Sequence, residues 1–150
     1  MSTPAAEVMN DLILMNNDRI KGYQKTIKNL KEKDKDLQDV FSEIIEQTTE
    51  FNRQLSEQVT QMGAEAETHT SASGKMHLAW ISLRATFTGH NRRALLAECE
   101  RGEDALRQGY FEALNEDNDL SSYQWELISE QAAAMKLTHD RIKALRDQAG

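Results

Sequence analysis

The sequence predicts an all-α fold, a bundle of four long helices and one short helix, on three observations. Apolar residues recur at steps of three to five along most of the chain, which places them on one face of a helix. No segment shows the sustained apolar–polar alternation of a half-buried strand. Pro4 is the single proline, whereas all-β folds need turn residues at short intervals. With 150 residues, 39 % of them hydrophobic, the chain is expected to form one domain over residues 1–150.

The first helical hairpin is expected over residues 4–33 and 36–63. Thr3 suits the N-cap of the first helix, and the proline after it suits the first helical position, where a missing N–H costs nothing. Asp36 is predicted to cap the second helix and Gly63 to end it. The predicted core-facing positions of this hairpin are Val8, Leu12, Met15, Ile20, Tyr23, Ile27 and Leu30, then Leu37, Phe41, Ile44, Thr48, Phe51, Leu55, Val59 and Met62.

The second helical hairpin is expected over residues 91–116 and 119–148. Asn91 is predicted to cap its first helix and Asp119 its second. The predicted core-facing positions are Leu95, Cys99, Leu106, Tyr110 and Ala113, then Leu120, Leu127, Ile128, Met135, Ile142 and Leu145.

A long connection separates the two hairpins. It starts with small and polar residues over 64–74 and continues with a short predicted helix at about 74–88, in which Met76, Trp80, Leu83 and Phe87 share a face. Two tight hairpins joined by one long connection are typical of a four-helix bundle with a single crossover.

The two hairpins also resemble each other in sequence. Gly22-Tyr23 matches Gly109-Tyr110, so a duplicated hairpin is the simplest account. Gly102 and Gly109 lie seven residues apart on one helical face, and a glycine inside a helix costs about 1 kcal/mol relative to alanine. The presence of two such glycines on one face, despite this cost, predicts the close approach of another helix, namely the first helix at Gly22.

A crossover bundle often holds two metal ions, bound by single glutamates and by two Glu-x-x-His motifs. That spacing places a carboxylate and an imidazole on the same inward face of a helix. The residues three positions before the four histidines are Ala66, Gly74, Phe87 and Lys136, so the chain has no Glu-x-x-His motif. We therefore expect no di-metal site, no cofactor and no catalytic residue.

Polar residues that interrupt the apolar faces at mid-bundle are predicted to form one buried layer of Asn16, Thr48, Glu103 and Gln131. The apolar stripes place no lysine or arginine at the level of Glu103, so its expected partners are neutral groups. On that basis Glu103→Gln is expected to be neutral or stabilising. The alternative interpretation is a single metal ion held by Glu103, or by His77 in the short helix.

Composition disfavours several classes of partner. The chain has 25 acidic and 18 basic residues and a net charge of −7, which disfavours binding to a phosphate backbone. No apolar run approaches the roughly 20 residues of a membrane helix, and the N-terminus lacks the basic-then-apolar pattern of a signal peptide. Cys99 is the single cysteine, which excludes an internal disulfide and predicts a cytoplasmic protein.

Several motifs are distinctive when taken together. They are the run ECERGED from Glu98 to Asp104, His77 three residues before Trp80, Gly22-Tyr23 after Asp18, and the run HDRIKALR from His139 to Arg146. This set resembles the PA2169 family, also called DUF2383, along essentially the whole chain. The resemblance implies a ferritin-like four-helix bundle without an established biochemical activity. The ligand pattern of ferritin and rubrerythrin carries over only at Glu103.

The sequence therefore favours a non-catalytic, ferritin-like helical bundle that acts by self-association or by binding another protein. A homo-oligomer, with a dimer favoured, is expected because symmetric assemblies are common and the short helix offers extra apolar surface. The alternative is a metal-dependent oxidase or peroxide-handling protein with a non-standard site around Glu103. A carrier of a small molecule between the helices is a third hypothesis, with Glu103 as its one polar anchor.

Overall fold

The computed structural model describes residues 3–71, 76–80 and 91–149, and these residues form helices and turns without a strand. The all-α prediction is confirmed. A short 3₁₀ helix, η1, lies between the first two long helices, and residues 76–80 are helical. The long helices are α1 (Pro4–Lys28), α2 (Leu37–Gln61), α4 (Arg92–Asn115) and α5 (Ser122–Gln148), and η1 spans Glu32–Asp34.

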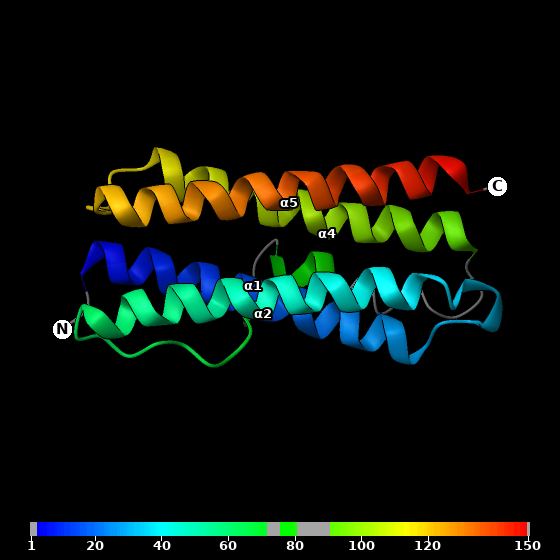
Figure 1. The fold of residues 1–150 in the computed structure, drawn as a ribbon, viewed down its shortest axis with the longest axis horizontal. Coiled ribbons are helices and arrows are strands. Elements are labelled where there is room, and N and C mark those ends of the chain that lie inside the picture. The colour runs from blue at the N-terminus through cyan, green and yellow to red at the C-terminus, as the bar shows by residue number, and fades with distance from the viewer. Residues whose placement is uncertain (1–2, 72–75, 81–90, 150) are drawn as a thin grey trace.

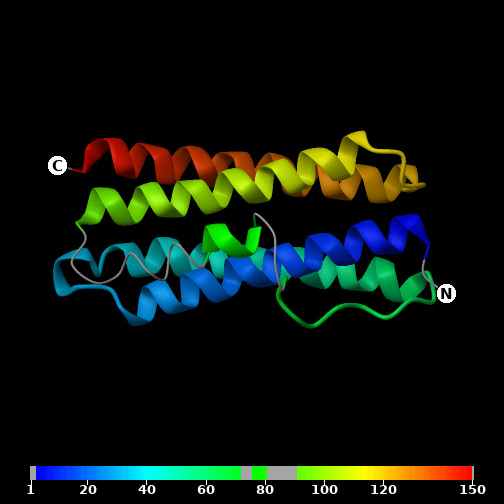
Figure 2. The same ribbon diagram turned by 180° about the vertical axis from the view of Figure 1, so that it is seen from behind.

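The long helices form two antiparallel hairpins, α1 with α2 and α4 with α5 (Figure 1). Helix α1 packs against α4, and α2 packs against α5. Because α2 ends and α4 begins at opposite ends of the bundle, these two helices run parallel, as a single crossover requires (Figure 1). The helical residues 76–80 lie between the two hairpins, as both views show (Figure 2).

The tryptophan of the 76–80 segment anchors it in the core. Trp80 is 1 % exposed, and its ring meets that of Tyr23 edge to face, with the ring centroids 5.2 Å apart. A Cβ atom at Gly22 would lie 2.5 Å from Cε3 of Trp80, and one at Gly102 would lie 2.8 Å from Cη2 of the same ring. Both glycines therefore make room for an indole.

The prediction that the first helix approaches both Gly102 and Gly109 was thus half wrong. A Cβ atom at Gly109 would lie 2.5 Å from Sδ of Met15 on α1, as a close approach of that helix requires. At Gly102 the neighbour is Trp80, which comes from the connection. The expected short helix at about 74–88 is helical over 76–80, and its remaining positions, with Leu83 and Phe87, lie outside the described residues.

Three predicted helix signals are found in the structure. The Thr3 hydroxyl accepts a hydrogen bond from the amide of Ala6, and the Asn91 side chain accepts one from the amide of Ala94. Gly63 follows α2 with a φ of +78°, a backbone conformation that favours glycine.

Two predicted helix boundaries were wrong. Helix α1 ends at Lys28 instead of residue 33, because the charged run that follows has no apolar face and forms η1 instead. Helix α5 begins at Ser122 instead of residue 119. Ser121 and Gln124 form a reciprocal capping box there, while Asp119 lies in the preceding turn with a φ of +59°.

The predicted cap at Asp36 is only partly found. Asp36 precedes α2, but its side chain makes no capping hydrogen bond. The carboxylate instead accepts two hydrogen bonds of 2.8 Å from Arg92, at the start of α4. Its role is to join the α1–α2 connection to the second hairpin.

None of the described helices combines the length and the hydropathy that crossing a bilayer requires.

Candidate functional site

The structure places the four polar residues of the predicted layer in the interior of the bundle. Asn16, Thr48 and Glu103 are fully buried, and Gln131 is 2 % exposed. They do not form one cluster. They belong to two separate hydrogen-bonded networks, and each network includes partners that the sequence analysis did not identify.

The first network is centred on a buried ion pair between Arg19 of α1 and Glu103 of α4. Nε of Arg19 donates to Oε2 of Glu103 at 2.9 Å, and Nη2 donates to Oε1 at 2.6 Å. The Tyr23 hydroxyl donates to Oε2 at 2.7 Å. The remaining Nη1 of Arg19 donates to the Thr48 hydroxyl, which itself donates to the carbonyl of Ile44.

The expectation of neutral partners for Glu103 was therefore wrong. Arg19 lies three residues after Asn16 and four before Tyr23, so it shares their helical face. The apolar stripe had placed Ile20 on the inner face, but Ile20 is only half-buried while Arg19 has no exposed side-chain surface. The signal that identifies Arg19 is its spacing from two polar inward residues.

Burial and neighbouring charges hold Arg19 and Tyr23 in their ordinary protonation states. Burial alone would lower the pKa of Arg19, but the charge and the hydrogen bonds of Glu103 raise it above its ordinary value. Burial, followed by the charge of Glu103, raises the pKa of Tyr23 well above its ordinary value. At neutral pH Tyr23 is a hydrogen-bond donor and Arg19 is a cation.

The second network lies about one helical turn away along α1. Nδ2 of Asn16 donates to the Tyr110 hydroxyl at 2.9 Å, and that hydroxyl donates to Oε1 of Gln131 at 2.7 Å. Nε2 of Gln131 donates to the carbonyl of Phe51 and to Oε1 of Gln54. All of these groups are neutral, and burial raises the pKa of Tyr110 above its ordinary value.

The two networks reflect the sequence repeat. Tyr23 bonds to Glu103, which stands seven residues before Tyr110. Tyr110 bonds to Asn16, which stands seven residues before Tyr23. Each tyrosine of the repeated Gly-Tyr pair thus bonds to the residue seven positions before the tyrosine of the other hairpin. These two reciprocal hydrogen bonds join the hairpins through the core.

The chemistry of the Glu103 site is that of a structural ion pair. Both carboxylate oxygens accept hydrogen bonds from Arg19 or Tyr23, and a guanidinium supplies the neutralising charge. A divalent cation would have to displace that guanidinium. His77 is half-buried on the 76–80 segment and is not a member of either network.

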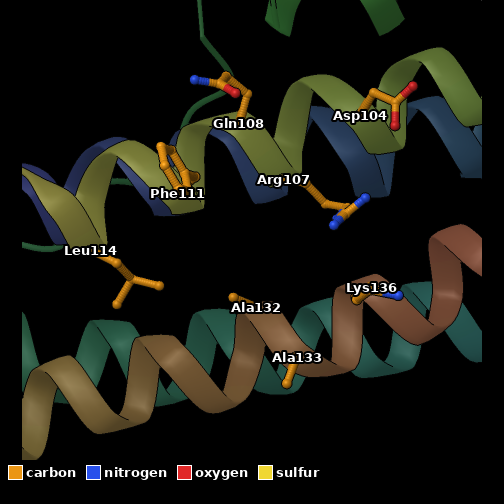
Figure 3. A pocket seen from close by; sticks show the side chains of 8 residues that line it. All are labelled: Asp104, Arg107, Gln108, Phe111, Leu114, Ala132, Ala133 and Lys136. Atoms are coloured by element: carbon orange, nitrogen blue, oxygen red, sulfur yellow. The ribbon is translucent and has the colours of Figure 1, made fainter.

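A second candidate site consists of two adjoining surface pockets on the α4–α5 hairpin, together called the α4–α5 groove. The first pocket, of about 570 Å³, lies between the two helices, the second, of about 650 Å³, is lined by α5 and the residues just before it, and Ala133 lines both. Phe111 and Leu114 of α4 and the alanines of α5 line the first pocket (Figure 3). Trp125 lines the second, and its indole N–H donates to the carbonyl of Leu114.

The α4–α5 hairpin carries most of the exposed large apolar side chains of the described residues. Phe111 is 60 % exposed and Trp125 is 48 % exposed, and Tyr123 and Leu137 are exposed as well. The only other such residue is Leu78, in the described part of the connection, and none lies on α1 or α2.

Charged side chains of both signs line the groove. Arg107 lies in the first pocket, and Glu126 and Glu130 lie in the second. Within the described part of the chain, none of these three side chains forms an ion pair. One end of the groove therefore carries an unpaired cation, and the other carries unpaired anions.

Comparison with known proteins identifies a family and no closer relative. No curated protein and no solved structure matches the chain. A family model described as a domain of unknown function, DUF2383, matches residues 4–116. This segment contains α1, α2 and α4 and stops before α5, so the run from His139 to Arg146 lies beyond it. Because the match covers well over half of the sequence, the chain belongs to the DUF2383 family.

Proposed function

We propose that this protein acts by self-association through the α4–α5 groove, as a non-catalytic bundle of ferritin-like topology. The observation that carries the proposal is the pair of exposed aromatic side chains, Phe111 and Trp125, that line that groove. Contiguous exposed apolar surface is characteristic of interaction sites, and aromatic residues are enriched in interface cores. The single long crossover supports the ferritin-like classification.

A second copy of the chain is the occupant that the charges favour. In a two-fold interface the same patch faces itself in the opposite direction. An axis crossing the groove between its two ends would bring Arg107 of one copy to the acidic end of the other, beside Glu126 and Glu130. The charges left unpaired within one chain would then be paired in the dimer.

The metal-dependent alternative around Glu103 has less support. Arg19 and Tyr23 already engage both oxygens of that carboxylate in the interior.

A cytoplasmic location belongs to the same proposal, and Cys99 supports it, because a single buried cysteine without a partner thiol suits a reducing compartment.

Sedimentation velocity over a concentration series tests self-association. We expect a dimer that dissociates on dilution. Phe111→Ser removes an aromatic anchor and should raise the dissociation constant about 30-fold or more, the usual effect at a central interface residue. A wild-type chain that stays monomeric at high micromolar concentration would refute the proposal.

A charge swap tests the two-fold arrangement. Arg107→Glu should weaken the dimer, and adding Glu130→Arg in the same chain should restore part of the affinity. Lys21→Glu, on the exposed surface of α1, is the matched control and should leave the dissociation constant unchanged. A dimer insensitive to Arg107→Glu would place the interface elsewhere.

A further inference from the structure

A histidine and two carboxylates converge on the surface between α4 and α5. Nε2 of His139 lies 2.8 Å from Oδ1 of Asp104 and 3.5 Å from Oε2 of Glu100. One ligand atom from each side chain lies within 4.8 Å of the other two. In the part of the chain that the structure describes, no other three acidic, histidine or cysteine side chains come this close.

The two helices hold these groups in place. Glu100 and Asp104 are four residues apart on α4, so both project from one helical face. His139 faces them from α5, and its side chain is 11 % exposed. Glu100 is 12 % exposed, whereas Asp104 is 58 % exposed and opens the cluster to solvent.

The other ring nitrogen of His139 also has a carboxylate beside it. Nδ1 lies 3.1 Å from Oδ1 of Asp140, which can accept a hydrogen bond when Nδ1 carries the ring proton. Lys136 holds the other oxygen of Asp140 at 2.9 Å. A histidine whose second nitrogen donates to a carboxylate is the usual arrangement around metal-binding imidazoles.

With Nδ1 protonated, Nε2 faces two carboxylates. A bare lone pair there would be repelled by both, so a second proton or a cation must lie between the three groups. Metal bonds to imidazole nitrogen and carboxylate oxygen are about 2.0–2.2 Å long, which places tetrahedral ligand atoms about 3.4 Å apart. The 3.5 Å separation is close to that value, whereas 2.8 Å is the length of a direct N–H···O hydrogen bond, so metal binding would move Asp104 slightly away from His139.

We propose that Glu100, Asp104 and His139 form a binding site for one divalent transition-metal ion of the zinc type. One nitrogen and two carboxylate oxygens suit such an ion, and water would complete the coordination on the side that Asp104 leaves open. Arg146 bonds to Oε1 of Glu100, which leaves Oε2 for the metal and orients the carboxylate. Asp104 also lines the first pocket of the α4–α5 groove, so the metal site borders the surface proposed for the dimer.

The test is titration of chelator-treated, tag-free protein with Zn²⁺ by calorimetry, and with Co²⁺ by visible absorption. We expect one equivalent to bind per chain, with a cobalt spectrum that shows nitrogen coordination. His139→Gln should abolish this binding. Asp140→Asn, which replaces the carboxylate that contacts both Nδ1 and Lys136, should weaken it about 10–100-fold.

His69→Gln is the matched control, because His69 is an exposed histidine near the carboxylate of Glu67. It should bind Zn²⁺ as the wild type does. The inference is refuted if the wild type binds no more tightly than His139→Gln, or if His69→Gln removes the binding. Asp104→Asn guards against misfolding of the histidine variant, because its side chain is mostly exposed, and it should weaken binding at least about tenfold.

Discussion

Arg19 and Glu103 are both buried away from water. The intact pair therefore adds little to the free energy of unfolding, whereas the loss of one partner costs a great deal. Two buried charges cost several kcal/mol each in desolvation, which their mutual attraction and hydrogen bonds offset. Removing one partner leaves the other charged and unpaired. The pair is therefore weak evidence for high stability, and we expect its main effect to be on the register in which the two hairpins dock.

Glu103→Gln should lower the free energy of unfolding by about 3–5 kcal/mol at pH 7, since it leaves the buried Arg19 guanidinium without a countercharge. This reverses the expectation from sequence, which took the partners of Glu103 to be neutral. Urea unfolding measures the change. Arg19→Leu with Glu103→Leu should cost less than Glu103→Gln alone, and a double variant that costs more would show that the ion pair itself drives stability.

Gly22 is predicted to be intolerant of even one methyl group. Gly22→Ala places Cβ 2.5 Å from the Trp80 ring, so the ring or the helix must shift, and we expect a loss of about 1–3 kcal/mol in the free energy of unfolding. Tryptophan fluorescence should change with it. Gly109→Ala is the control, because its neighbour is the flexible end of Met15 and the cost should be smaller. Equal losses at both positions would contradict a specific role for Trp80.

At the scale of single elements, the helices and several of their ends could be predicted, but the end of α1 and the start of α5 could not. A stripe repeating every 3.6 residues identifies a helix whatever surrounds it. A helix end depends instead on a few local hydrogen bonds, and both Asp119 and Ser121 are residue types that suit an N-cap. The choice of Ser121 follows from Gln124, which completes the capping box, a signal present in the sequence.

The start of α5 gives a direct comparison of these two residues. Ser121→Ala should lower the free energy of unfolding by about 1 kcal/mol, because the amide of Gln124 loses its acceptor. Asp119→Gly should be neutral or stabilising, because glycine adopts a φ of +59° without strain. Thermal unfolding of the two variants measures both effects. A larger loss of stability for Asp119→Gly than for Ser121→Ala would show that Asp119 is the cap after all.

In the candidate site, too, the sequence pattern predicts which residues are buried but not which of them contact each other. The repeat and the interrupted stripes place Asn16, Thr48, Glu103 and Gln131 in the interior, where the structure also has them. Which of them touch could not be read from one chain, because hydrogen-bond partners depend on how the helices rotate and cross. Arg19 escaped detection because its charge is typical of a surface residue, although its spacing matches the inner face.

At the scale of the whole molecule, ion pairs between the hairpins supplement the buried networks. Arg141 of α5 bonds to Glu43 of α2 at 2.7 Å. At the end of the bundle where α4 starts, Arg92 joins Asp36 and Asp34 of the α1–α2 connection. These contacts are partly exposed, so each contributes little energy, yet they align the ends of the hairpins.

The Arg92 contact predicts how the molecule responds to acid. The hydrogen bond from Arg92 is the largest cause that lowers the pKa of Asp36 below its ordinary value of 3.8. Because the folded pKa lies below the unfolded one, the contact stabilises the fold above the unfolded value and stops doing so as the pH falls through the folded value. Carbon-detected NMR titration should show the depressed pKa, and Arg92→Gln should return it toward 3.8. Arg53→Gln, which breaks a pair within α2, is the control, and an Asp36 pKa unmoved by Arg92→Gln would contradict the link between the hairpins.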